Sequence, residues 1–365
     1  MKDWKIVTWK EVLEIKNGKN QKKVQNEAGI YPIYGSGGVM GYSNDFLCPE
    51  GTTIIGRKGS INNPIYVNEK FWNVDTAFGL IPSQKLDNKY LYYFCTTYNF
   101  LKHNKATTLP SLTKLDLLKI QIPLPPLEEQ KRIAAILDAA DLHRQKTKAL
   151  LDKYDELAQA LFLDMFGDPV TNPKGWEKME IQNITSVSSG STPSRELPEN
   201  YMGDIPWVKT GEVNGKEIID TEEKISQTAL ENSSCKVYPK GSILIAMYGQ
   251  GKTRGQVGYL GIPASTNQAC AVLKYSEKVN FVFLYYLLKL CYEDLRSLGR
   301  GGNQPNLNSG LIKKYLVINP PIEIQEAFSK KIKIIESQIS QAEQSLQKAE
   351  ELFQSLLQKA FKGEL

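Results

Sequence analysis

Apolar and small side chains recur at alternating steps of four and three residues along two long stretches of the chain. The stretches run from residue 128 to 166 and from 323 to 361, and neither contains proline or glycine. Steps of four and three place side chains on one face of an α-helix, which forms the seam of a coiled coil. Each stretch is therefore predicted to be a single helix, about 58 Å long at ~1.5 Å per residue.

The seam positions predict how the two helices pair. Arg144 also falls on the first seam, where an unpaired buried charge would be costly, so it is a candidate register device or partner contact. Large residues on one seam can face alanines on the other, which favours antiparallel pairing within the chain, although pairing between two chains also fits the sequence. The seam residues singled out are Leu137, Ala140, Leu151, Tyr154 and Leu161, and Ile332, Ile335, Leu346, Phe353 and Leu356.

The same passage precedes both helices. The first copy is KIQIPLPPLEEQKRI (119–133), the second is KYLVINPPIEIQEAF (314–328), and Pro125 and Pro320 lie 195 positions apart. Proline cannot continue a helix backwards, so each Pro-Pro marks a helix start. The sequence therefore predicts an internal repeat with four segments: residues 1–126, 127–167, 168–321 and 322–365.

The two segments outside the helices also resemble each other. Each has a turn into an apolar strand, PEGTTIIGRKG (49–59) and PKGSILIAMYG (239–249), and each later has a Pro-x-Leu turn, LPSLTK (109–114) and QPNLNS (304–309). Short β-branched and aromatic runs separated by Gly and Pro are typical of mixed domains with long loops. We therefore predict an α+β fold with two similar domains, each followed by a long helix.

Composition limits the classes of function. Hydrophobic residues make up 41% and charged residues 23%, which are values of a globular protein. The five cysteines are never closer than 21 positions, as between Cys270 and Cys291, so a CxxC metal or redox motif is excluded. The first residues have no apolar signal segment, and we expect a soluble, cytoplasmic protein without a bound metal.

Positive charge is concentrated outside the helices. Residues 1–126 carry 16 Lys and Arg against 10 Asp and Glu, and residues 168–321 carry 17 against 15. The helical segments carry 6 against 8 and 6 against 7. This distribution favours domains that contact a polyanion and helices that contact each other or other proteins.

Two enzyme-like strings fail on their context. AMYGQGKT (246–253) fits a loose phosphate-binding loop, but the following RGQVGYLGIP contains too much glycine and proline to form the helix that this motif requires. INPPI (318–322) resembles the Asn-Pro-Pro-aromatic motif of adenine methyltransferases, but Ile322 stands where the aromatic residue would stack on a flipped base. We interpret both as structural segments.

Polar and basic loops at matched places in the two domains are the candidate DNA contacts. Arginine, asparagine and glutamine can recognise base edges, whereas lysine, serine and threonine suit phosphates. The alternative is that these are ordinary solvated turns. The candidates are Arg57, Lys58, Ser60, Asn62, Lys105, Thr107 and Thr108 in the first segment, and Tyr248, Lys252, Arg254, Gln256, Arg300, Asn303 and Gln304 in the second.

Over essentially its full length, the chain resembles the specificity (S) subunit of type I restriction–modification systems. LPPLEEQKRIAAILD (124–138) is the most specific piece; the second copy diverges, with Ile324 for the second Glu. The resemblance implies two target-recognition domains that bind the halves of a bipartite sequence in double-stranded DNA. It also implies an antiparallel coiled coil that sets their spacing and docks two methyltransferase (M) subunits, with restriction (R) subunits joining the complex.

The resemblance further implies a non-catalytic subunit. S-adenosylmethionine, ATP and Mg²⁺ would then belong to the partner subunits, and this chain would bind no cofactor. Binding to DNA should weaken steeply with salt, because phosphate contacts release counterions. The remaining alternatives are a P-loop nucleotide-binding enzyme, and a coiled-coil adaptor that recognises a ligand other than DNA.

Overall fold

The computed structural model describes residues 4–104, 110–299 and 306–365. The chain forms two compact units. Unit 1 comprises Met1–Ala149 together with Ala342–Leu365, and unit 2 comprises Leu150–Gln341. Each unit thus contains one globular domain and parts of both long helices.

Unit 1 is built on a four-stranded sheet in the order β2-β8-β5-β6, with a three-stranded sheet β4-β3-β7 and a two-stranded pair β1-β9. Strand β5 is buried along its length, with Ile55 in the main core and Ile54 in a second core on the opposite face. The strands are β1 (Lys5–Thr8), β2 (Leu13–Asn17), β3 (Tyr31–Gly35), β4 (Gly38–Ser43), β5 (Thr52–Gly56), β6 (Ile65–Val67), β7 (Trp72–Asn73), β8 (Ala77–Pro82) and β9 (Gln121–Leu124). The short helices are α1 (Trp9–Val12), α2 (Asn88–Thr97), η1 (Phe100–His103) and α3 (Lys114–Leu117).

Unit 2 repeats this topology. Its large sheet has the order β11-β18-β15-β16-β13, which adds one strand to the plan of unit 1, and β14-β12-β17 and β10-β19 form the smaller sheets. The strands are β10 (Lys178–Glu180), β11 (Val187–Ser189), β12 (Ile205–Val208), β13 (Glu217–Ile218), β14 (Glu223–Ile225), β15 (Ile243–Ala246), β16 (Val257–Leu260), β17 (Ser265–Thr266), β18 (Cys270–Leu273) and β19 (Leu316–Ile318). The short helices are α5 (Ile181–Ile184), η2 (Pro198–Tyr201), η3 (Thr210–Glu212), α6 (Gln227–Glu231), α7 (Phe281–Leu290), α8 (Tyr292–Ser297) and α9 (Ser309–Lys313). The predicted mixed domains and their repeat are confirmed.

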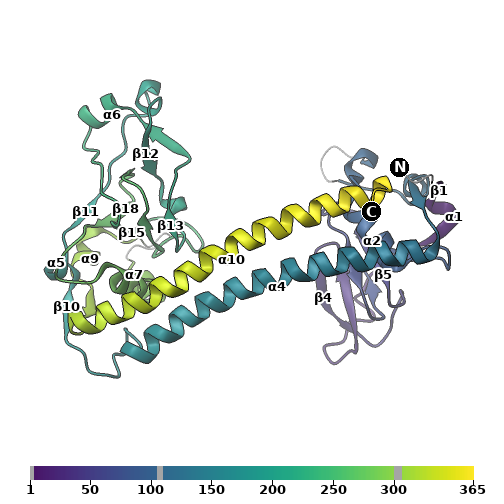
Figure 1. Cartoon of the computed structure of the whole chain (residues 1–365), viewed down its shortest axis with the longest axis horizontal. Coiled ribbons are helices and arrows are strands. Elements are labelled where there is room, and N and C mark those ends of the chain that lie inside the picture. Colours follow the sequence, from purple (N-terminus) through teal and green to yellow (C-terminus); the bar gives the residue numbers. More distant parts are fainter. Residues whose placement is uncertain (1–3, 105–109, 300–305) are drawn as a thin grey trace. The chain divides into compact units, whose positions relative to one another are not determined.

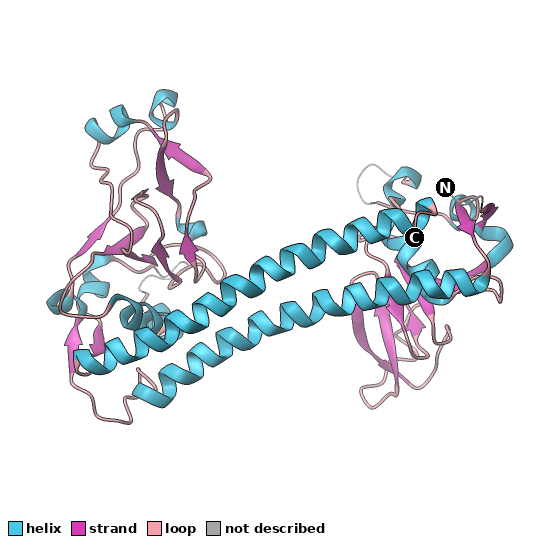
Figure 2. Cartoon of the chain, in the orientation of Figure 1, coloured by secondary structure: helices cyan, strands magenta, loops and turns pink. Residues whose placement is uncertain are grey.

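The two long helices are α4 (Leu127–Phe166) and α10 (Ile322–Lys362) (Figures 1 and 2). Each begins one residue before the predicted start, directly after its Pro-Pro. All ten seam residues that the sequence analysis singled out are buried or half-buried, whereas Leu142, Leu157 and Leu352, which lie off the seam, are about half exposed.

The helices pair within one chain and are antiparallel. In unit 1, Leu137 and Ala140 of α4 share a core with Phe353 and Leu356 of α10. In unit 2, the later part of α4 packs on the earlier part of α10, where the rings of Phe162 and Phe328 lie 5.4 Å apart. Early residues of one helix therefore meet late residues of the other in both units.

Arg144, the charged residue on the seam, is half-buried and paired. Its Nη2 lies 2.6 Å from the Asp141 carboxylate, and its guanidinium carbon lies 4.8 Å from the centre of the Phe353 ring. The charge is thus compensated by a carboxylate one helical turn away and by a cation–π contact across the helix pair.

A buried glutamine joins each long helix to its globular domain. In unit 1, the Gln130 amide accepts a hydrogen bond from the Asp87 N–H at 2.8 Å and donates to the Pro125 carbonyl at 2.8 Å. In unit 2, Gln325 accepts from the Asn280 N–H at 2.8 Å and donates to the Pro320 carbonyl at 2.7 Å. Asp87 and Asn280 are the N-cap residues of α2 and α7, so each glutamine links two helix starts.

Glu336 gives unit 2 an expected dependence on pH. Burial raises the pKa of the Glu336 carboxyl, and the Glu217 charge raises it further. The folded state then keeps the proton to a higher pH than the unfolded chain, so stability is lost as pH rises through the raised pKa. We expect Glu336→Gln to raise the melting temperature of unit 2 by a few degrees near neutral pH, with little gain at a pH below about 4. Thermal melts at both pH values test this, and an equal gain at both would contradict it.

Candidate nucleic-acid interface

In unit 1 the basic loop after β5 is fixed to the Pro-x-Leu turn. The Leu112 N–H donates to the Arg57 carbonyl at 2.9 Å, and the Gly59 N–H donates to the Pro110 carbonyl at 3.2 Å. Lys58 and Ser111 form a short antiparallel bridge. The structure therefore brings together two segments that lie about fifty residues apart in the sequence.

The candidate side chains of this loop differ in exposure. Arg57 is half-buried, with Nη1 3.4 Å from the Asp75 carbonyl. Asn62 donates to the Asn99 side chain at 3.0 Å and accepts from the Phe100 N–H at 2.8 Å, so it holds η1 in place. Lys58, Ser60 and Asn62 are all exposed, but Asn62 is engaged by these hydrogen bonds, so Lys58 and Ser60 are the better placed of the four to meet a ligand.

In unit 2 the same backbone contact recurs. The Leu307 N–H donates to the Met247 carbonyl at 3.0 Å, which matches the Leu112 to Arg57 bond in unit 1. Met247, buried next to β15, therefore occupies the place of Arg57, and exposed Tyr248 that of Lys58. The two domains share the scaffold at this point but present different side chains.

The remainder of the second loop is supported by α8. The Tyr292 hydroxyl donates to the Lys252 carbonyl at 2.8 Å, and the Arg296 guanidinium donates to the Arg254 carbonyl at 3.3 Å. The Lys252 side chain is exposed, whereas Arg254 and Gln256 are half-buried. The segment after Lys252 runs through turns into β16, so this described part has no helix start of the kind a phosphate-binding loop needs.

Six of the candidate residues cannot be placed. They lie outside the described residues and are Lys105, Thr107 and Thr108, and Arg300, Asn303 and Gln304.

Among the residues that are described, no group of three or more His, Cys, Asp or Glu side chains could hold a metal ion.

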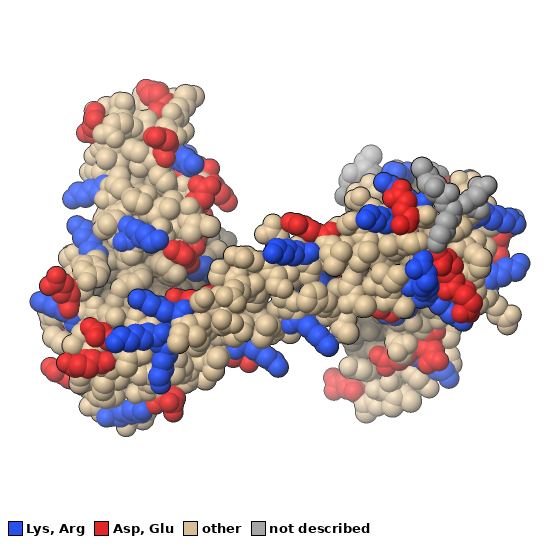
Figure 3. All heavy atoms as spheres, viewed as in Figure 1, with Lys and Arg blue, Asp and Glu red and all other residues tan. Residues whose placement is uncertain are grey.

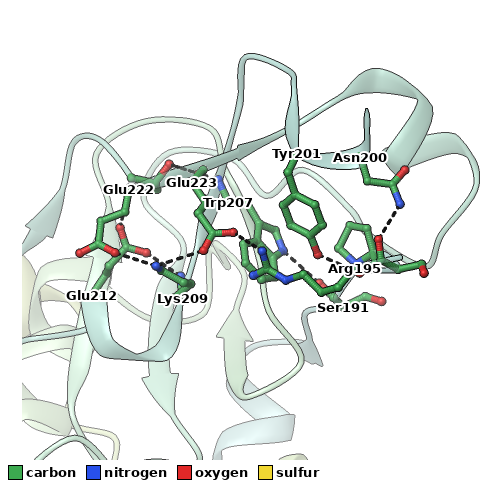
Figure 4. Close-up of polar contacts among 12 residues, drawn as sticks. Ser191, Arg195, Asn200, Tyr201, Trp207, Lys209, Glu212, Glu222 and Glu223 are labelled. Atoms are coloured by element: carbon green, nitrogen blue, oxygen red, sulfur yellow. Dashed lines mark hydrogen bonds and ion pairs between the residues drawn. The ribbon is translucent and has the colours of Figure 1, made fainter. Parts of the chain in front are cut away.

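An ion-pair cluster beside β12 and β14 in unit 2 (Figure 4) contains none of the residues predicted from the sequence. Glu223 lies 2.6 Å from Arg195 and 3.2 Å from Lys209, and Lys209 lies 2.6 Å from Glu222. The Arg195 guanidinium also lies 4.0 Å from the centre of the Tyr201 ring. The pKa of Glu223 is lowered, chiefly by its hydrogen bond from Arg195. No local spacing predicts this cluster, because Arg195 and Glu223 are 28 positions apart.

Charge is divided within the second domain. Acidic side chains are prominent at the end of unit 2 that carries α6 and β12 (Figure 3), and residues 190–235 contain nine Asp and Glu against four Lys and Arg. The rest of segment 168–321 therefore has 13 basic against 6 acidic residues. The excess positive charge of this domain therefore lies outside residues 190–235, in the part that includes the loop around Lys252 between β15 and β16.

Comparisons with known proteins agree on one family. The family model described as "Type I restriction modification DNA specificity domain" matches residues 1–152 and 173–351. The MjaIX type I restriction enzyme specificity subunit of Methanocaldococcus jannaschii is 26% identical over 87% of this chain and 78% of its own length. The EcoDI type I restriction enzyme specificity subunit of Escherichia coli is 22% identical over 100% of this chain and 89% of its own.

Solved structures show the same fold. The S subunit of a type I restriction–modification system from M. genitalium superposes with a TM-score of 0.66 and 18% identity, over 98% of this chain and 96% of that one. A chain from a structural study of assembly of the type I R-M system gives a TM-score of 0.60 and 16% identity, over 100% of this chain and 99% of that one.

None of the helices in the described ranges is long and apolar enough to cross a membrane.

Proposed function

The chain belongs to the type I restriction–modification DNA specificity family, and on that premise we propose that each of its two globular domains recognises one half of a bipartite DNA sequence. The observation that carries the proposal is the repeated loop support. One backbone hydrogen bond, Leu112 to Arg57 and Leu307 to Met247, holds an exposed loop in each domain. Different side chains on a shared scaffold suit two unlike half-sites.

The long helices would hold the two domains and the partner subunits. A helix of 40 residues is about 60 Å long at ~1.5 Å per residue, which corresponds to about 18 base pairs at ~3.4 Å each. In this proposal the helices set the spacing of the half-sites and dock two methyltransferase subunits, and restriction subunits join them. The chain itself is non-catalytic, and S-adenosylmethionine, ATP and Mg²⁺ are bound by the partners.

Methylation mapping tests this function. The chain is co-expressed with a type I methyltransferase subunit from its own organism, and methylated adenines are mapped across the host genome. We expect one bipartite motif, whereas a chain that fails to co-purify with the methyltransferase and yields no motif would support an adaptor for another ligand.

A domain exchange assigns the half-sites. Replacing residues 1–126 by those of another family member should change one half of the motif only. Because Phe353, Leu357 and Ala360 complete the core of unit 1, the exchange should include residues 342–365 from the same donor. A change in both halves would contradict independent recognition.

A further inference from the structure

The β3–β4 hairpin of unit 1 has a surface that is uncharged and rich in exposed apolar side chains. Residues 28–44 contain no charged side chain. The strands are joined by only Ser36 and Gly37, because Gly35 pairs with Gly38. Even so, Val39, Met40 and Tyr42 are 52%, 57% and 47% exposed. Single exposed apolar residues are common, but several along one ribbon indicate a binding surface.

An irregularity in the pairing gathers two of these side chains on one face. Val39 pairs with Tyr34 and Tyr42 pairs with Pro32, and the register shifts between these pairs, leaving Met40 unpaired. Pro32 and Tyr34 are two positions apart on β3 and so point to the same face. Their partners Val39 and Tyr42 therefore share that face although three positions separate them.

The outer edge of β4 is poorly suited to pairing with a strand of another protein. The Asn26 N–H donates to the Tyr42 carbonyl at 2.8 Å, and Gln25 forms a bridge with Ser43. These contacts cover the C-terminal end of β4, and the register shift interrupts the remainder. Only a short edge is left, which disfavours recognition through main-chain hydrogen bonds.

Charged side chains of both signs flank the uncharged hairpin, since Glu27 and Asp45 are exposed directly before and after residues 28–44. Lys22 and Lys23 are exposed in the turn that leads to Gln25, beside the β4 edge. Just after β4 in the chain, the Phe46 ring has the Lys70 amine 4.8 Å from its centre. A two-stranded ribbon fits the major groove of DNA, where apolar side chains contact thymine methyl groups and flanking lysines suit phosphates.

The matched sheet of unit 2 has a different chemistry. There β12 and β14 are not joined by a tight turn, and β14 begins with Glu223, which is paired with Arg195 and Lys209 (Figure 4). The two small sheets therefore present an apolar surface in one domain and a charged surface in the other.

We propose that the β3–β4 hairpin is a major-groove recognition element of the first domain, with Val39 and Tyr42 contacting thymine C5-methyl groups. The inference rests on the proposed function, because it concerns the half-site that residues 1–126 recognise. It requires at least one A·T pair in that half-site.

Duplexes with deoxyuridine in place of thymine test the inference. The complex of the full chain with its methyltransferase is titrated with target duplexes in which single thymines of the first half-site lack the methyl group. Each contacted methyl group should contribute about fourfold in affinity, the value of one buried carbon. We expect the Val39→Ala, Tyr42→Ala variant to bind the intact duplex about four- to tenfold more weakly and to have lost its sensitivity to deoxyuridine.

Controls separate the inference from folding and from the proposed function. Ile6→Ala removes a similarly exposed apolar side chain from β1 and should leave affinity unchanged, and an unchanged melting temperature shows that each variant is folded. Unaltered affinity and deoxyuridine sensitivity in the hairpin variant, or a first half-site without an A·T pair, would overturn the hairpin assignment alone. The hairpin assignment alone would also be overturned if the hairpin variant kept its DNA preference but no longer bound the methyltransferase. A wild-type complex without sequence preference would overturn the proposed function and the hairpin with it.

Discussion

Replacing Gln130 with leucine is expected to lower the free energy of unfolding of unit 1 by about 2–4 kcal/mol. Gln130 is fully buried, and leucine would leave the Asp87 N–H and the Pro125 carbonyl without the partners they have at 2.8 Å. An unsatisfied buried polar group costs about 1–3 kcal/mol. Gln130→Glu should not be milder near neutral pH, because it would bury a carboxylate against the Lys85 and Pro125 carbonyls that the amide now meets as a donor.

Urea unfolding and hydrogen exchange measure this effect. Exchange should accelerate at the start of α2 and at the start of α4, because Gln130 joins the two. Gln145→Leu is the matched control on an exposed part of α4 and should change stability by less than about 0.5 kcal/mol. Gln325→Leu should produce the corresponding loss in unit 2. If Gln130→Leu were no more disruptive than Gln145→Leu, the buried amide would not be what fixes the helix to the domain.

Removing Lys58 and Lys252 together is expected to weaken DNA binding by the complex and to reduce its dependence on salt. Both side chains are exposed on loops that the scaffold holds firmly. Each phosphate contact contributes about 0.9 to the slope of log affinity against log salt concentration. The Lys58→Ala, Lys252→Ala variant should therefore lose up to about 2 units of slope, with affinity falling on the order of tenfold at low salt.

Titrations at several salt concentrations give this slope. Lys119→Ala, Lys314→Ala is the matched control, since these exposed lysines hold equivalent positions before the two Pro-Pro passages. The methylated motif should not change, because phosphate contacts carry no sequence information. An unchanged slope would remove the two loops from the DNA interface. ATP binding by the chain, abolished by Lys252→Ala, would instead favour a nucleotide site.

The long helices were predictable because their signals are local. The ladder of apolar positions and the Pro-Pro before each helix lie in one continuous stretch, and the observed starts differ from the predicted ones by a single residue. The choice between pairing within a chain and between chains was not predictable, because both bury the same seam. Arg144 illustrates this, since Asp141 is a local partner three positions away on α4, whereas the contact with Phe353 appears only once the helices are placed.

The candidate site was predictable in outline only. The sequence located the loop after each apolar strand, but could not show that Asn62 holds Asn99 and Phe100, which are more than thirty positions away. It also could not distinguish the exposed Val39 from the buried Ile33, two apolar residues of the same hairpin. Such distinctions depend on which face of a sheet meets the core, and that is decided by the whole domain.

Unit 1 is assembled from two separate segments of the chain, and this has a consequence for folding during synthesis on the ribosome. Its core includes Phe353, Leu357 and Ala360, which are translated only after the whole of unit 2. Unit 2 is one continuous segment, Leu150–Gln341, and can close as soon as it emerges. At roughly 5–20 residues per second, the N-terminal domain must wait on the order of 10–40 s for its final helix. During that interval a nascent chain exposes the apolar core residues that α10 covers, and a prematurely terminated chain would expose them permanently.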